Sequence, residues 1–242
     1  MFNVAGITSN GSNSHVNFGA GGHQEARGGQ KLNIFYVEGV LAELDTGGEF
    51  IYERASGKLH VFPNSTKPLG SSTLIVPQLA TLISINGADG VVLSGLTIKH
   101  SLPTFMRKYE SLPSGDWSIY RGGAIKVEQA ERVTIQTCTL DHLGGLGIFF
   151  SNHVVDSVIA GNELVGIADT GIALVGSAFY ADGTQPTHPE RNLVTLNHIH
   201  EVGVVGKGQA AYFQALASHN TVSRNVMFNG PRTGIECNDG FG

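Results

Sequence analysis

The chain has 242 residues, a formal net charge of −5, 33 glycines and only 14% charged residues. Average proteins contain about 7% glycine and about 25% charged residues, so long charged helices are excluded, and the glycines lack the three-residue period of collagen. The hydrophobic fraction of 41% excludes a disordered chain, and no basic stripe supports nucleic-acid binding. We therefore expect an all-β chain with many turns.

The N-terminal third predicts a small element that precedes any regular repeat. Phe35–Leu44 fits a short helix, and the alternating segments Glu49–Glu53 and Lys58–Phe62 fit a β-hairpin closed by a glycine turn. We expect this helix-and-hairpin element, residues 33–63, to lie outside the main stack of strands.

Neither a membrane span nor a leader peptide is predicted. Leu74–Ile85 is the longest apolar stretch, but it is shorter than the 18 or so residues of a span, and Pro77 interrupts it. Residues 1–30 carry Gly, Ser and Asn instead of the basic and apolar regions of a signal sequence. The chain is therefore either cytosolic or a piece whose leader lies upstream.

A repeat of about 24 residues begins at residue 123. In each unit a small residue is followed by an apolar strand. This motif places Ile125, Ile148 and Ile172 at intervals of 23 and 24 residues, and it recurs at Gly234–Cys237. A second phrase in each unit places Asn162, Asn197 and Asn225 at one equivalent position, where Leu96 stands in an earlier unit.

Two short strands per unit, separated by glycine bends, are typical of one coil of a parallel β-helix. Stacked coils share one core, because no single unit can bury its apolar face alone. The equivalent asparagines are expected to stack inward as a hydrogen-bonded ladder, which offsets the cost of burying them. A leucine-rich repeat and an antiparallel sandwich fit the pattern less well.

Two interruptions of the repeat carry information. The unit that starts at Ile172 is about 40 residues long, and its excess, residues 177–190, predicts an inserted loop on one face. The chain stops directly after a core strand with no polar capping repeat, so we expect residues 1–242 to be one β-helix domain truncated at its C-terminal end. Such an uncapped end is expected to promote self-association.

No cofactor or metal site is predicted. The sequence has no HExxH, CxxC or EF-hand pattern, and Cys138 and Cys237 are expected to be two buried free thiols. His198 and His200 flank Ile199 and so face the same side of a strand, but two such histidines are more often solvated than metal ligands.

The outward residues of the Gly-Ile strands predict an elongated groove suited to a polysaccharide. By alternation, the outward set comprises Lys126, Phe149, Ala173, Tyr212 and Glu236. Trp117, the only tryptophan, precedes a core strand. Either it caps the edge of a coil, or its ring is a platform for the apolar face of a sugar.

Acidic residues near the C-terminus are the candidate catalytic groups. Asp239 follows an outward-facing stretch, and Glu236 is the nearest second carboxylate, while Asp141, Asp169 and Asp182 are more distant options. Glycosidases use two carboxyl groups, one as acid and one as base or nucleophile. The alternative without a catalytic role is that Asp239 belongs to an ordinary Asp-Gly turn.

Three segments resemble the right-handed parallel β-helix enzymes of glycoside hydrolase family 141. They are Gly115–Ala124 (GDWSIYRGGA), Gly206–Ala215 (GKGQAAYFQA) and Asn229–Gly242 (NGPRTGIECNDGFG), and Val37–Pro63 is similar to the helix-and-hairpin element of that family. The resemblance covers nearly the whole chain in the family's order, and the last of the three motifs is specific.

The resemblance implies a right-handed coil and a secreted glycosidase acting on plant or algal polysaccharide, of the α-L-fucosidase or xylanase type. It makes Asp239 the leading catalytic carboxylate. It also implies groove contacts by four further side chains, those of Arg121, Lys207, Gln214 and Arg232.

The sequence also departs from the family pattern. Glu236 stands where an amide is expected, and Gly208 separates Lys207 from Gln209. We expect the second acid to lie beyond residue 242 and the chain alone to be inactive or nearly so. Two other classes stay open: a polysaccharide lyase or epimerase, and a non-catalytic carbohydrate-binding or structural β-helix.

Overall fold

The computed structural model describes residues 2–21, 37–64, 69–111, 117–177 and 187–238. The chain divides into two compact units, one made of Met1–Ala26 with Pro77–Gly242 and the other of Arg27–Val76. No helix among the described residues is long and apolar enough to cross a membrane.

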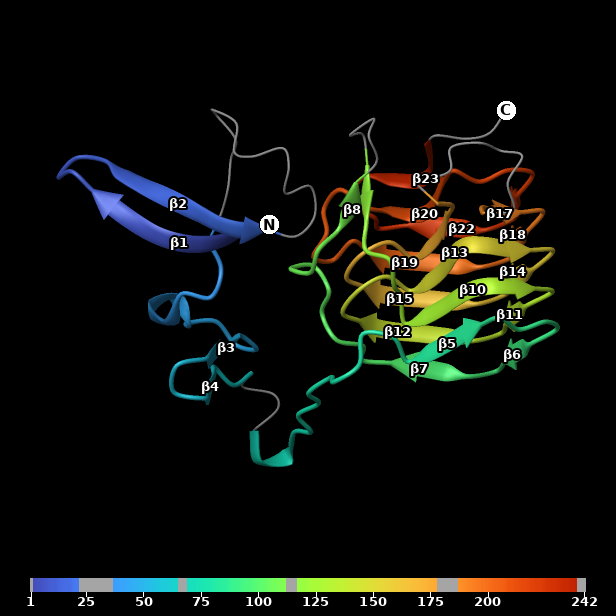
Figure 1. Cartoon of the computed structure of the whole chain (residues 1–242). Helices are drawn as coiled ribbons and strands as arrows, with labels where there is room; N and C mark the ends of the chain where they lie inside the picture. Colours follow the sequence, from blue (N-terminus) through green and yellow to red (C-terminus); the bar gives the residue numbers. More distant parts are fainter. Residues whose placement is uncertain (1, 22–36, 65–68, 112–116, 178–186, 239–242) are drawn as a thin grey trace. The chain divides into compact units, whose positions relative to one another are not determined.

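Three sheets of parallel strands make up most of the first unit (Figure 1). Sheet 1 contains β5 (Ile83–Asn86), β10 (Ile125–Glu131), β13 (Ile148–Val155), β16 (Ile172–Val175), β20 (Ala210–Ala215) and β23 (Thr233–Asn238). Sheet 2 contains β6 (Val92–Ser94), β11 (Thr134–Gln136), β14 (Val158–Ala160), β18 (Leu193–Thr195) and β21 (Thr221–Ser223). Sheet 3 contains β7 (Thr97–Lys99), β12 (Thr139–Leu143), β15 (Glu163–Ile167), β19 (His198–Val202) and β22 (Val226–Phe228).

The order of these strands is that of a parallel β-helix. The chain visits sheets 1, 2 and 3 once per turn, and each strand pairs in parallel with its counterparts in the turns before and after. Figure 1 shows the successive layers from β5 in green to β23 in red. The all-β, parallel-sheet prediction is therefore confirmed.

The predicted intervals correspond to the observed register. Ile125 pairs with Ile148, and Ile148 pairs with Ile172. These side chains are fully buried in one apolar core that runs through the coils. Because every coil contributes aliphatic residues to the same interior, burial of this continuous core holds the stack together.

The predicted outward position of Tyr212 is wrong. Ile172 pairs with Tyr212, which places Tyr212 in the inward row, and its side chain is fully buried in the core. Burial raises the pKa of its hydroxyl, and the nearby Cys237 raises it further. The residue in line with Ala173 is Phe213, so Phe213 replaces Tyr212 in the outward row.

The asparagine ladder is confirmed. The Nδ2 of Asn162 donates to the Oδ1 of Asn197 at 2.9 Å, and the Nδ2 of Asn197 donates to the Oδ1 of Asn225 at 2.9 Å. Each Oδ1 also accepts the backbone N–H of the preceding asparagine, at 3.0 and 2.9 Å. These bonds satisfy polar groups that would otherwise be unpaired beside the core.

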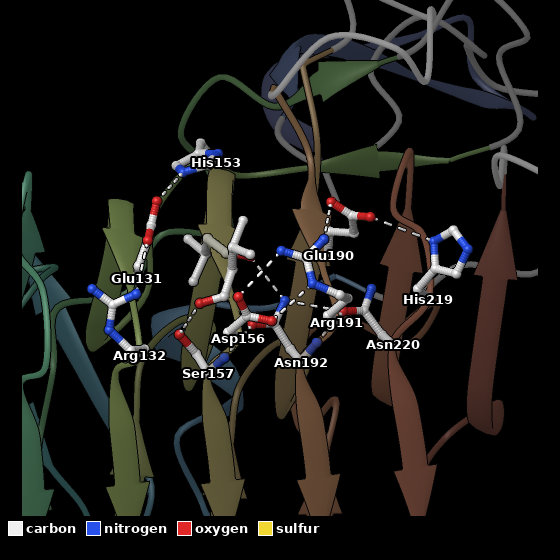
Figure 2. A network of polar contacts seen from close by, with 12 residues as sticks. Glu131, Arg132, His153, Asp156, Ser157, Glu190, Arg191, Asn192, His219 and Asn220 are labelled. Carbon is white, nitrogen blue, oxygen red and sulfur yellow. Dashed lines mark hydrogen bonds and ion pairs between the residues drawn. The ribbon is translucent and has the colours of Figure 1, made fainter.

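A second polar ladder, which was not predicted from the sequence, lies at the turn from sheet 1 to sheet 2. Figure 2 shows Asn192 between Ser157 and Asn220, each on a neighbouring coil. The Oδ1 of Asn192 accepts the N–H of Ser157 at 3.0 Å, and its Nδ2 donates to Asn220 at 3.0 Å.

Outside this ladder, Arg191 binds Asp156 at 2.8 Å and Glu190 at 2.7 Å. The hydrogen bond from Arg191 holds the pKa of Asp156 below its usual value.

Glycines form fewer of the bends than predicted. Gly90, Gly161 and Gly166 have a positive φ, but many bends are made by non-glycine residues such as Arg132 and Asp156, with φ near 51°. By contrast, Gly147 and Gly171 are needed for close approach. A Cβ on Gly171 would lie 2.7 Å from the carbonyl oxygen of Ala211 in the next coil.

The smaller elements agree with the predictions in part. The hairpin is present as β3 (Phe50–Glu53) and β4 (Lys58–Val61), in the second unit. Of the predicted helix, the described residues contain one 3-10 turn, Leu41–Glu43. A hairpin that was not predicted, β1 (Phe2–Ser9) with β2 (Ser14–Gly21), lies near the N-terminus.

Two further predictions need correction. Most of the predicted insertion lies outside the described residues, but its last two residues form β17 (Pro189–Glu190), which pairs with β13 in sheet 1. Cys138 and Cys237 are both free thiols, as predicted. Cys138 is buried, whereas Cys237 is exposed because it lies on the last described strand of sheet 1.

Candidate active site

The outer face of sheet 1 carries the residues that the sequence assigned to a groove. One outward row runs across successive strands through Lys126, Phe149, Ala173, Phe213 and Glu236. The next outward row, two residues further along each strand, runs through Glu128, Ser151, Val175, Ala215 and Asn238. Polar residues therefore stand at both ends of the face, and apolar residues occupy its centre.

A separate segment covers the apolar centre. It includes β8 (Glu110–Ser111) and β9 (Ser118–Ile119), which form a short antiparallel pair. Trp117 packs edge-on against Phe213, with ring centroids 5.4 Å apart, in a buried cluster that also contains Phe149. Only 4% of Trp117 is exposed. Its ring thus packs on the strands and offers no open face for a sugar.

Arg121 holds this covering segment to the sheet. Its guanidinium forms a two-pronged ion pair with Glu110, at 2.6 and 3.0 Å. It also donates to the carbonyl oxygens of Val175 (3.0 Å) and Gly176. Its donors are thus occupied by protein groups, and the geometry favours a structural clamp over the predicted groove contact.

The first polar end of the face is centred on Glu128. This carboxylate binds Lys126 at 2.7 Å, Ser151 at 3.0 Å and Asn152 at 2.8 Å. Burial acts to raise its pKa, but the hydrogen bonds from these three partners outweigh burial and lower it. Three hydrogen-bond donors therefore hold Glu128 as a charged carboxylate, which is a poor proton donor near neutral pH.

The second polar end contains Glu236 and Arg232, two of the predicted site residues. The guanidinium of Arg232 lies 3.1 Å from the carboxylate of Glu236 and donates to the carbonyl oxygen of Gly208 at 3.3 Å. Thr233 donates to the other oxygen of Glu236 at 3.4 Å. Arg232 and Thr233 also line a pocket together with Met227 and Phe228.

Two other predicted residues make their contacts away from this end, and a third lies outside the described residues. Gln214 lies in the inward row and accepts a hydrogen bond from the Tyr212 hydroxyl at 2.8 Å, so it points into the coil and not into a groove. Lys207 donates to the carbonyl oxygen of Val204 at 2.6 Å on the exposed surface. Asp239 lies outside the described residues.

The spacing of the two carboxylates on the outer face excludes them as a catalytic pair. Glu128 on β10 and Glu236 on β23 are separated by β13, β16 and β20. Four steps between strands amount to about 19 Å at about 4.8 Å each. Glycosidase carboxyl groups lie only about 5–9.5 Å apart. A partner for Glu236 must therefore come from another part of the chain.

Two of the three more distant acids have partners elsewhere in the described part of the chain. Asp141, on the outer face of sheet 3, pairs with Lys99 and His142, and these partners outweigh burial and lower its pKa. Asp169 is buried, accepts a hydrogen bond from Tyr109 at 2.6 Å and lies outside the outward rows of sheet 1. Asp182 falls outside the described residues.

Asp169 should give the folded protein a measurable dependence on pH. Burial raises its pKa, in spite of the hydrogen bonds from Tyr109 and Thr170. A carboxyl group whose pKa is higher in the folded state stabilises that state below its unfolded pKa of about 4 and loses this contribution as pH rises. Asp169→Asn stays neutral throughout, so its stability relative to the wild type should increase from about pH 4 upward.

Urea unfolding of both proteins between about pH 4 and 8 measures this difference. We expect the gap in unfolding free energy to widen by about 1.4 kcal/mol for each unit by which the pKa is raised. Parallel stability curves over the whole range would show that Asp169 titrates alike in the folded and unfolded states.

Comparisons with known proteins support the fold. No protein-family model matches the chain, and no curated protein matches its sequence. One solved structure, described as a glycoside hydrolase, superimposes with a TM-score of 0.81 at 17% identity, over 98% of this chain and 48% of the other. An alginate lyase from Paenibacillus sp. str. FPU-7 matches with a TM-score of 0.38 at 16% identity, over 66% of this chain and 59% of the other.

The first of these likenesses shows a shared fold, and the chain spans about half the length of that glycoside hydrolase. The TM-score of the alginate lyase is too low to indicate a shared fold.

Proposed function

We propose that this chain is part of a right-handed β-helix glycoside hydrolase that acts on plant or algal polysaccharide. The observation that carries the proposal is Glu236, a carboxylate at the end of an elongated outer face, held by Arg232 and Thr233. The Trp117 segment covers the centre of this face, but further coils would extend its polar end, and a row of parallel strands suits a long polymer more than a small ligand.

Asp239 is the proposed partner of Glu236, in place of the acid beyond residue 242 that the family pattern led us to expect. Three residues of extended chain span at most about 10 Å between Cα atoms, so the two carboxyl groups can reach the separation that glycosidases require. One group then protonates the leaving oxygen, and the other activates water or attacks the anomeric carbon. Arg232 keeps the Glu236 carboxylate oriented by its ion pair.

The resemblance to glycoside hydrolase family 141 narrows the proposal to an α-L-fucosidase or xylanase type in a secreted protein. Because the chain spans about half of its glycoside hydrolase neighbour, we infer that further coils complete the substrate site and that the 242 residues alone turn over little or no substrate. Self-association through the last coil stays a prediction.

Hydrolysis of aryl α-L-fucosides and of xylan tests this function. In a longer polypeptide that continues past Gly242, Asp239→Asn and Glu236→Gln should each lower kcat/KM by about 10²- to 10⁴-fold, as expected for loss of a general acid or base. Glu43→Gln changes an exposed residue of the other compact unit and serves as the control with unchanged activity. Circular dichroism verifies that the variants remain folded.

Turnover that survives in both acid variants would remove Glu236 and Asp239 from the mechanism. Efficient hydrolysis by the 242-residue chain, abolished by Asp239→Asn, would contradict the need for further coils.

A non-catalytic carbohydrate-binding protein is the second candidate. The occupied donors of Arg121 and the covered centre of sheet 1 favour the structural form of this alternative, because both make this face a packed surface. Binding to glycans without product formation by the longer polypeptide would support this alternative. A lyase is less favoured, because Lys126 and Arg121 are both ion-paired on this face and neither is a free base.

A further inference from the structure

The outer face of sheet 3 brings together two histidines and a carboxylate from different coils. Glu163 on β15 pairs in register with His198 on β19, and His200 lies two residues further along β19 on the same side. One ligand atom from each side chain lies within 4.8 Å of the others. The shared face of His198 and His200 follows from alternation, but the carboxylate comes from a strand 35 residues earlier in the chain.

The distances between the donor atoms are close to those of a coordination sphere. The Oε1 of Glu163 lies 3.7 Å from the Nε2 of His200 and 3.9 Å from the Nδ1 of His198. Two ligand atoms that are each about 2.1 Å from a tetrahedral ion lie about 3.4 Å apart. The two measured distances exceed this value by about half an ångström or less. All three donor atoms lie within 4.8 Å of one another, so small side-chain shifts would let them bind one ion.

His200 is prepared to act as a ligand through its Nε2 atom. Its Nδ1 contacts the carboxylate of Glu201, whose other oxygen accepts a hydrogen bond from Asn229 at 2.7 Å. A carboxylate on one ring nitrogen keeps the proton there and leaves the other nitrogen as a lone-pair donor, as in carboxylate–histidine–zinc arrangements. Among the described residues, the buried Nε2 of His200 has no hydrogen-bond partner.

Aromatic packing fixes the orientation of both imidazole rings. Phe228, in register with His200 on the next coil, stacks on the His200 ring with centroids 4.9 Å apart and an angle of 1°. The His198 and His200 rings lie 4.6 Å apart. The side chains of Glu163 and His198 are about half exposed, at 49% and 47%, so an ion can enter from solvent and keep water in its remaining positions.

From this geometry we propose that Glu163, His198 and His200 form a binding site for a divalent transition-metal ion such as Zn²⁺. Two imidazoles and one carboxylate are a known ligand set for Zn²⁺, whereas Ca²⁺ and Mg²⁺ prefer oxygen ligands. The bound ion cross-links β15 to β19 and thus joins two coils. The site is independent of the proposed glycosidase function, since it lies on sheet 3. Of the candidate acids, Glu236 lies on sheet 1, and Asp239 follows that strand in the sequence.

Isothermal titration of the untagged 242-residue chain with ZnCl₂ tests the proposal. We expect one equivalent to bind, with a dissociation constant in the micromolar range or below, and the thermal midpoint to rise with Zn²⁺ concentration. His200→Ala should abolish this binding. Glu201→Gln, which changes only the partner of His200, should weaken it about 10- to 100-fold.

His219→Ala is the matched control. His219 lies in the turn between sheets 1 and 2, is 74% exposed and faces Glu190 at 3.6 Å, so its loss should leave Zn²⁺ binding unchanged. Titration of the wild-type chain with CoCl₂ adds a readout that needs no variant, because histidine ligation of Co²⁺ produces visible absorption bands. Retention of the full affinity in His200→Ala, or no saturable binding below about 1 mM, would overturn the site.

Discussion

Asn197→Ala is expected to destabilise the coil stack by about 3–6 kcal/mol, because several buried polar groups lose their partners together. The Oδ1 of Asn197 accepts from the backbone N–H and the side chain of Asn162. Its Nδ2 donates to the carbonyl oxygen of Ile159 at 3.0 Å. Each buried group left unpaired costs about 1–3 kcal/mol, and whole domains are stable by only about 5–15 kcal/mol.

Urea unfolding monitored by circular dichroism measures this loss. Asn225→Ala is the internal comparison, because Asn225 makes the same bonds to Asn197 at a partly exposed position, so its replacement should cost less. If both variants lose under about 1 kcal/mol, the ladder contributes little, and the apolar core alone sets the stability of the stack.

Trp117→Ala is expected to destabilise the protein by about 3–5 kcal/mol, the usual cost of truncating a large buried aromatic side chain. Its ring packs on Phe213 and belongs to the cluster with Ile119 and Phe149. Removal leaves a cavity between the covering segment and the outer face of sheet 1. Trp117→Phe should lose less, since it keeps an aromatic ring at this position.

The same pair of variants separates the two roles that the sequence allows for Trp117. Packing predicts that the alanine variant has a lower unfolding free energy and an increased exposure of apolar surface, which dye binding reports. A sugar platform instead predicts unchanged stability with a loss of glycan affinity. Unfolding curves and glycan binding on the same samples therefore decide between these roles.

The register error at Tyr212 shows where sequence periodicity fails. Three coils follow each other at intervals of 23 and 24 residues, so Ile125, Ile148 and Ile172 could be aligned by counting. The next strand comes after the insertion, and its small residue is Ala211 instead of glycine. Since Ala211 takes the place of Gly171, the correct alignment was available from the Ala-Ala-Tyr segment.

The second ladder had a signal in the sequence as well. Asn192 and Asn220 each precede the asparagine of the first ladder by five residues. Both ladders arise because every coil makes the same turns, so an amide at one turn stacks on the amide of the next coil. In the earlier coil, Ser157 takes the place of the asparagine. Its hydroxyl group donates to the carbonyl oxygen of Val155 and accepts the backbone N–H of Val133.

The sequence by itself determined the coil architecture, the Asn162–Asn197–Asn225 ladder and the hairpin in residues 49–62. These features depend on short-range alternation and on a repeat, and both are visible along the chain. Only the tertiary structure decided that the Trp117 segment covers sheet 1 and that Glu163 meets His198 and His200. Such contacts join residues from different coils, and their register depends on how the coils stack and not on local pattern.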